Sequence, residues 1–160
     1  MRILQDIGPY LALLVLLAGW LCGCHQDPSA QEAKAIKAIE DLGGKVTRDD
    51  SLPGRPVVGV TFPEVNSITN AGMKELRNFR NLRLLDIHGT GITDAGLKNL
   101  KELKGLQTLI LEANDITDVG LRELKELKGL ETLDLHSLKI TDVGLREIKG
   151  LTALRTLDLV

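Results

Sequence analysis

The chain has 160 residues, a length that favours one domain, and its 20 Lys and Arg against 22 Asp and Glu give a formal net charge of −2. This balance argues against nucleic acid as a partner, because binding to a phosphate backbone requires a strongly basic surface. Aromatic residues contribute only 2% of the chain, so a buried core must be built mainly from Leu and Ile.

The first 24 residues have the anatomy of a targeting segment. Residues 10–21 are apolar, which suits the core of a signal peptide but is too short for a comfortable membrane span. The run ends in Leu21-Cys22-Gly23-Cys24, which resembles the lipobox of bacterial lipoproteins. By that resemblance Cys24 carries the lipid and anchors the protein in a membrane of the bacterial cell envelope, on the periplasmic or surface side. A simple secretory peptide, which gives a secreted protein, and an uncleaved signal anchor are the alternatives.

A short cap is predicted between the targeting segment and the rest of the chain. Residues 25–31 are polar and indicate a tether. Residues 32–42 place apolar side chains on one side of a predicted helix, which two glycines end. Residues 45–48 and 57–62 are predicted strands with a turn between them. Because terminal units of repeat proteins are atypical, we interpret residues 32–62 as an N-terminal cap.

A 24-residue unit then occurs three times in succession. The copies are residues 82–105, 106–129 and 130–153. A degenerate copy precedes them and a truncated copy follows at residues 154–160, so the repeat region spans residues 63–160. Self-similarity at a fixed period indicates a solenoid, in which each unit buries its apolar face against its neighbours.

Each unit encodes a strand, a turn and a helix. Its opening alternates apolar and polar residues, which is typical of a strand with one buried face. An Ile-Thr-Asp triplet follows, and its Thr and Asp are favourable at a helix start. Apolar residues then recur three apart, at Leu97, Leu100 and Leu103 in the first unit, and predict the buried stripe of a short helix. The closing glycine, Gly105 or Gly129, is expected to let the chain turn back.

The unit resembles the leucine-rich repeat, and its ITDxGLxxL segment is similar to the cysteine-containing, ribonuclease-inhibitor-like subclass of bacterial type. The resemblance covers about residues 58–160. It implies an α/β solenoid with one parallel strand per 24-residue repeat and a helix on the convex side, preceded by the small α+β cap. The ninth position, usually Cys or Asn in this subclass, holds Thr90, Asn114 and Leu138, so its polar ladder is expected to be broken.

In such a solenoid the polar positions of the strands lie on the concave face. Adjacent strands are about 4.8 Å apart, so equivalent residues of successive units form ladders across that face. The ladders are Leu84, Thr108, Thr132 and Thr156; Asp86, Ile110, Asp134 and Asp158; and His88, Glu112, His136 and Val160. From them we predict a partner-binding site made of Asp86, His88, Glu112, Thr132, Asp134 and His136.

This face is mildly acidic, and the chain contains no motif of a phosphate loop, a zinc hydrolase or a serine hydrolase. The sequence therefore predicts a non-catalytic module, without a cofactor or small-molecule substrate, that binds a basic protein partner by surface complementarity. One alternative is a metal-dependent enzyme at His88, Glu112 and His136, although an open sheet supplies few groups to orient the ligands. Another is a structural envelope protein that assembles through the uncapped edge at residues 154–160.

Overall fold

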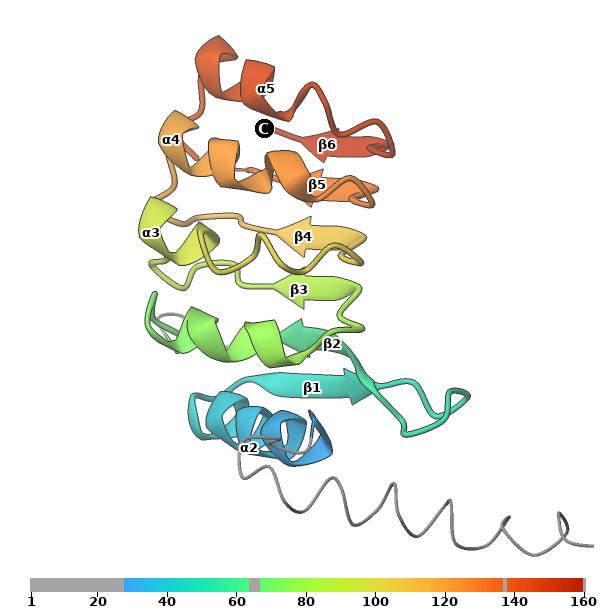
Figure 1. Ribbon diagram of the computed structural model, residues 1–160. Coiled ribbons are helices and arrows are strands. Elements are labelled where there is room, and N and C mark those ends of the chain that lie inside the picture. The colour runs from blue at the N-terminus through green and yellow to red at the C-terminus, as the bar shows by residue number, and fades with distance from the viewer. Residues whose placement is uncertain (1–27, 64–66, 137, 160) are drawn as a thin grey trace, which may run out of the picture.

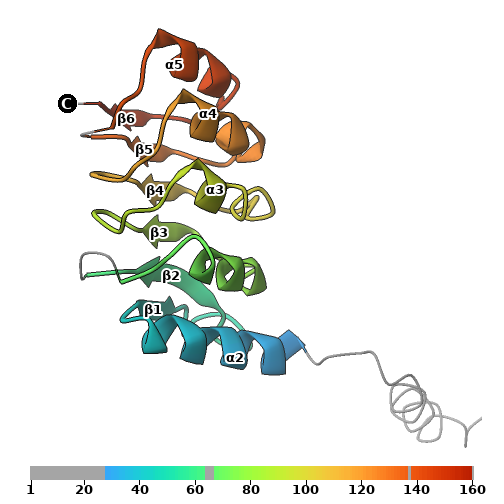
Figure 2. The same cartoon turned by 90° about the vertical axis from the view of Figure 1, so that its left-hand side faces the viewer.

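The structure, a computed structural model, describes residues 28–63, 67–136 and 138–159; the predicted lipidation site at Cys24 and the ladder position Val160 lie outside these residues. The strands are β1 (Lys45–Arg48), β2 (Val57–Thr61), β3 (Leu84–Asp86), β4 (Thr108–Ile110), β5 (Thr132–Asp134) and β6 (Thr156–Asp158). They form one sheet in which spatial order follows chain order, and Figure 1 shows them stacked as successive layers. The view turned by 90° in Figure 2 places the sheet on one side of the stack and the helices on the other.

Helix α2 (Pro28–Asp41) covers the first layer of the core. It begins at Pro28 rather than at residue 32, so residues 28–31 form its first turn and not part of the predicted tether. Proline is favourable at the first helical position, because the N–H group it lacks has no partner there anyway. Ala35 and Ile39 on this helix are fully buried and join the core cluster that contains Phe62. The predicted strands of the cap are present as β1 and β2, which pair antiparallel with Lys45 opposite Thr61.

From β2 onward every neighbouring pair of strands is parallel. Leu109 pairs with Leu85 on one side and with Leu133 on the other, and all three side chains have 0% exposure. Equivalent leucines of successive units are therefore neighbours in a continuous aliphatic core, as the alternation of apolar residues requires. The predicted α/β solenoid with one parallel strand per repeat is confirmed.

The convex side is built from shorter helical segments than we predicted. They are the 3-10 helix η1 (Gly72–Asn78), the single turns α3 (Asp94–Leu97) and α4 (Asp118–Leu121), the 3-10 helix η2 (Arg122–Glu126) that continues α4, and α5 (Asp142–Ile148). The spacing of the apolar residues explains why 3-10 geometry replaces part of the predicted helices. A 3-10 helix has three residues per turn, so apolar residues three apart lie directly above one another on its buried side. The amides of Leu100 and Leu103 donate to carbonyls three residues earlier, at 2.9 Å each, and both side chains stay buried.

The chain turns at the closing glycines Gly105 and Gly129, as predicted, and neither residue has a positive φ. In the turn that follows β3, Gly89 and Gly91 have a positive φ, of 61° and 70°; the other described residues with a positive φ are Gly43, Gly54, Arg55 and Ala113. Only glycine adopts this backbone region without a steric cost. The chain returns to the next strand through a turn in which the Leu106 amide donates to the carbonyl three residues earlier, at 3.0 Å.

Hydrogen bonds link successive units at their helix starts. The predicted capping role of the triplet threonine is confirmed, because the side chains of Thr93, Thr117 and Thr141 each accept from the amide two residues ahead. The triplet Asp binds across to the next unit. Asp94 accepts from the amide and hydroxyl of Thr117 at 2.9 and 2.8 Å, and Asp118 accepts from those of Thr141 at 2.8 and 2.6 Å. The bonds from Thr141 lower the pKa of Asp118.

The ninth-position ladder ends at Leu138, as expected, but its first two members are linked. The Thr90 hydroxyl lies within hydrogen-bond distance of two acceptors that share its single proton, the Ile87 carbonyl at 2.7 Å and Asn114 Oδ1 at 3.0 Å. The Asn114 amide donates to the carbonyls of Ile87 and Leu111 at 2.8 and 2.9 Å. Thr90 and Asn114 are 3% and 8% exposed, so they satisfy backbone groups that water does not reach.

Candidate protein-binding face

The residues predicted to bind a partner lie in β3 and β5 or two residues after β3, β4 and β5. Figure 2 shows these strands on the side of the stack opposite the helices. The strand register places Asp86 directly beside Ile110, and Ile110 directly beside Asp134. Thr132 lies beside Thr108 in the same pair of strands. All five are half-buried, which means that each presents part of its side chain to solvent and the rest to its neighbours on the sheet.

The other three predicted residues, His88, Glu112 and His136, follow the strands at the start of the turns. The Gly89 amide donates to the Glu112 carbonyl at 2.8 Å, and the Ala113 amide donates to the His136 carbonyl at 3.1 Å. These bonds continue the stacking of the strands by one more position. The structure therefore brings all six predicted residues onto one continuous face.

The best-defined contact on this face joins Asp86 to His88. Asp86 Oδ1 lies 2.7 Å from His88 Nδ1 and also accepts from the His88 backbone amide at 3.2 Å. The hydrogen bond and the charge of Asp86 raise the pKa of His88, with a smaller contribution from Glu112. The side chains of His88 and Asp86 are 45% and 21% exposed, so this pair of titratable groups lies at the surface, where a ligand could contact it.

Asp134 repeats the backbone part of this arrangement two strands away. Its Oδ1 accepts from the His136 backbone amide at 2.9 Å. Each aspartate therefore ends its strand and holds the first turn residue in place, a local side-chain to backbone bond that Asp forms readily. Sequence reasoning treated these residues only as exposed charges. The sequence did contain a signal for their hydrogen bonds to the turn, since an Asp often accepts from the backbone amide two residues further along the chain.

The alternative of a metal site at His88, Glu112 and His136 receives no support from the geometry. His88 Nδ1 lies 2.7 Å from Asp86 Oδ1, so only Nε2 of this ring could serve as a ligand. In the part of the chain that the structure describes, no group of three or more His, Cys, Asp or Glu side chains could hold a metal ion.

Sequence reasoning left two apolar residues of this face out of the predicted site. Leu84 is 37% exposed although it lies in a strand, and Ile110 is half-buried between two aspartates. The positions that match Leu84 in the next two units hold Thr108 and Thr132. The available signal was an aliphatic side chain at a strand position where the other repeats are polar.

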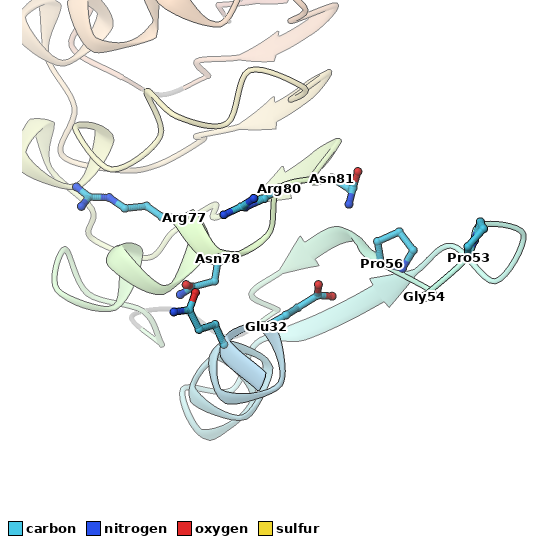
Figure 3. A pocket seen from close by; sticks show the side chains of 9 residues that line it. Glu32, Pro53, Gly54, Pro56, Arg77, Asn78, Arg80 and Asn81 are labelled. Carbon is cyan, nitrogen blue, oxygen red and sulfur yellow. The ribbon is translucent and has the colours of Figure 1, made fainter. Parts of the chain in front are cut away.

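A separate cavity of about 320 Å³ lies where the cap meets the first repeat (Figure 3). It is bounded by the start of α2, the β1–β2 turn and the end of η1. Its Glu32 carboxylate accepts from the Val57 amide at 3.1 Å, and the guanidinium of Arg77 donates to Asn99 of the next unit at 2.6 Å. The first of these bonds holds α2 to β2 within the cap, and the second joins the degenerate repeat to the first full repeat, so both side chains have a structural role.

Comparison with known proteins agrees with the repeat architecture. Residues 104–160 match the model of the leucine rich repeat family. Among solved structures, internalin C2 from Listeria monocytogenes is similar at 28% identity with a TM-score of 0.48, and the match covers 54% of this chain and 36% of that one. A second internalin of the same species, inlF, is similar at 23% identity with a TM-score of 0.41, covering 54% and 31%. The chain thus spans about a third of the length of these two proteins. No curated protein matches it significantly.

The 24-residue period and the parallel strand in every unit are those of a leucine-rich repeat solenoid, and the family model matches residues 104–160, about a third of the chain. Among the residues that the structure describes, no helix has the length and apolar character needed to cross a membrane.

Proposed function

We propose that this protein is a non-catalytic binding module that captures a basic protein partner on its strand face. The observation that carries the proposal is an acidic row of one carboxylate from each of three successive units, Asp86, Glu112 and Asp134, on one face of the sheet. Asp86 and Asp134 are held in place by the backbone amides of His88 and His136. A surface that is already ordered loses little conformational entropy when a partner docks. Carboxylates exposed on such a surface attract a partner that carries Lys and Arg.

We also propose that the protein is exported and anchored by a lipid on Cys24, in the envelope of a bacterium. The support is the apolar run of residues 10–21 followed by the lipobox-like Leu21-Cys22-Gly23-Cys24. Metabolic labelling with a fatty acid should mark the full chain, and Cys24→Ser should abolish the label and release the protein from membranes. Labelling that persists in Cys24→Ser would refute this assignment.

The binding proposal is tested by neutralising the acidic row. A triple variant, Asp86→Asn, Glu112→Gln and Asp134→Asn, removes three charges while keeping side-chain size, and Asn still accepts the turn amide. Partner capture from native envelopes, quantified by mass spectrometry, should fall about tenfold or more and should lose its dependence on salt.

The matched control neutralises three glutamates outside the strand face, with Glu102→Gln, Glu123→Gln and Glu126→Gln. This control alters the net charge by the same amount and should leave partner capture unchanged. Equal capture by the wild type and the strand-face variant would exclude the acidic row as the binding site.

A further inference from the structure

The repeats of this chain provide an internal reference for the strand face. At the first outward strand position, three consecutive units hold Thr108, Thr132 and Thr156, whereas the preceding unit holds Leu84. Folding of the solenoid therefore does not require an aliphatic residue at this position. Leu84 is nevertheless 37% exposed, and its neighbour on the other side, Gly59, has no side chain to cover it.

The second outward position shows the same kind of exception. Asp86, Asp134 and Asp158 occupy it in three units, and Ile110 occupies it in the fourth. Ile110 lies directly between Asp86 and Asp134, about 4.8 Å from each at the backbone. An aliphatic side chain here is flanked on both neighbouring strands by carboxylates.

The two exceptions are close in space. Leu84 and Asp86 are two residues apart on β3, and Ile110 pairs with Asp86, so Leu84 and Ile110 are diagonal neighbours across two strands. Such pairs are about 7–8 Å apart, within reach of one large side chain placed over both. They form a small apolar patch, which we define as Leu84 and Ile110, enclosed by Asp86, Glu112 and Asp134.

We infer that this apolar patch is the anchor point for a basic segment in which one large aliphatic or aromatic side chain lies between two Lys or Arg residues. The inference rests on the proposed binding function and specifies its partner. The apolar side chain would cover Leu84 and Ile110, while the flanking cations would pair with Asp86 and Asp134. Charge complementarity selects this occupant, since an apolar segment without cations would remove the enclosing carboxylates from water and supply no positive charge in return.

The test uses two synthetic peptides and the purified full chain. Each peptide has seven residues, with lysine at the second and sixth positions and threonine elsewhere, except that the central residue is leucine in one peptide and serine in the other. In an extended peptide these three positions lie on one side. The wild-type protein should bind the leucine peptide about tenfold more tightly than the serine peptide, measured by NMR titration.

Two variants then locate the anchor. Leu84→Thr introduces the residue that the following units already carry at this position, and Ile110→Thr keeps a β-branched residue in the strand, so both should fold. Each should weaken binding of the leucine peptide about tenfold and leave the serine peptide unaffected. The matched control is Val143→Thr, since Val143 is 58% exposed at the start of α5, on the other side of the molecule, and should change neither affinity.

Equal affinity of the wild type for the two peptides, or unchanged leucine-peptide affinity in Leu84→Thr and Ile110→Thr, would overturn the inference. Failure of the inference is distinguishable from failure of the proposed function. If Asp134→Asn weakens both peptides while the threonine variants have no effect, the acidic face binds cations and the apolar anchor does not exist. If neither peptide binds at millimolar concentration, the inference is also overturned.

Discussion

Replacing Gly120 with Ala is expected to disturb the link between neighbouring repeats. Gly120 lies in α4 against Asp94 of the preceding unit, where a Cβ atom would overlap Asp94 Oδ1 and would approach Ile116 Cγ2 to 3.0 Å. To make room, Asp94 must move away from the amide and hydroxyl of Thr117, to which it is bound at 2.9 and 2.8 Å. The absence of a Cβ atom at Gly120 therefore allows this inter-repeat contact.

The expected cost follows from the bonds that are lost. A hydrogen bond to a charged group contributes about 1.5–3 kcal/mol when it is protected from water, and less when it is partly solvated as here. Two weakened bonds give a loss of about 2–3 kcal/mol, against a gain of about 1 kcal/mol for Ala over Gly in a helix. The net destabilisation is about 1–2 kcal/mol, which lowers the Tm of a chain of this size by roughly 2–8 °C.

The free energy of unfolding would be measured by urea titration at pH 7, followed by circular dichroism. The matched control is Gly105→Ala, because a Cβ atom there meets nothing closer than the Leu82 carbonyl at 3.8 Å. That variant should be as stable as the wild type, or more stable by up to about 1 kcal/mol, since it restricts the unfolded chain.

A double-mutant cycle identifies the cause. In an Asp94→Ala background the overlap with the carboxylate is gone, so adding Gly120→Ala should cost much less than it does in the wild type. If Gly120→Ala is as stable as Gly105→Ala, Asp94 moves aside without penalty and the reasoning is wrong. If the cost persists in the Asp94→Ala background, the obstruction comes from Ile116 and not from the hydrogen-bonded link.

Three further predictions concern single side chains. Asn114→Ala should lower the unfolding free energy by about 3 kcal/mol or more, because several buried backbone partners lose their hydrogen bonds; a loss below about 1 kcal/mol would mean that water replaces them. NMR titration should give His88 a pKa above 6.5 that falls toward 6.5 in Asp86→Asn. The stability that the His88–Asp86 contact contributes is fully present below pH 6.5 and is lost as the pH rises through the folded pKa of His88. An unshifted pKa of His88 would contradict the observed contact. Ionised Asp118 contributes stability at pH values above its unfolded pKa of 3.8, and this stability is lost as the pH falls through its lower folded pKa. Asp118→Ala should therefore make the free energy of unfolding less dependent on pH in acid. An unchanged acid dependence would argue against the bond to Thr141.

Much of the candidate site was predictable from the repeat alone. Once the 24-residue period aligns the units, the alternation within each strand decides which side chains face outward, and this placed Asp86, Glu112 and His136 on one face before any contact was known. The alignment could not reveal which outward residues bind each other. His88 and His136 occupy equivalent positions, yet the ring of His88 contacts Asp86 at 2.7 Å, whereas the Asp134 contact at 2.9 Å is with the backbone amide of His136.

The solenoid follows from the repeat alone, because periodic apolar residues at a fixed spacing leave stacked layers as the only arrangement that buries them all. How those layers are joined is visible only in the folded chain. In the sequence, the Asp of each Ile-Thr-Asp triplet suits the start of its own helix. In the fold, the carboxylates of Asp94 and Asp118 bind the Thr of the next unit, and Asn70 does the same in the degenerate repeat. The glycines that leave room for these three side chains are Gly96, Gly120 and Gly144. Such a bond joins residues about one repeat apart, and its geometry exists only after the two units have packed.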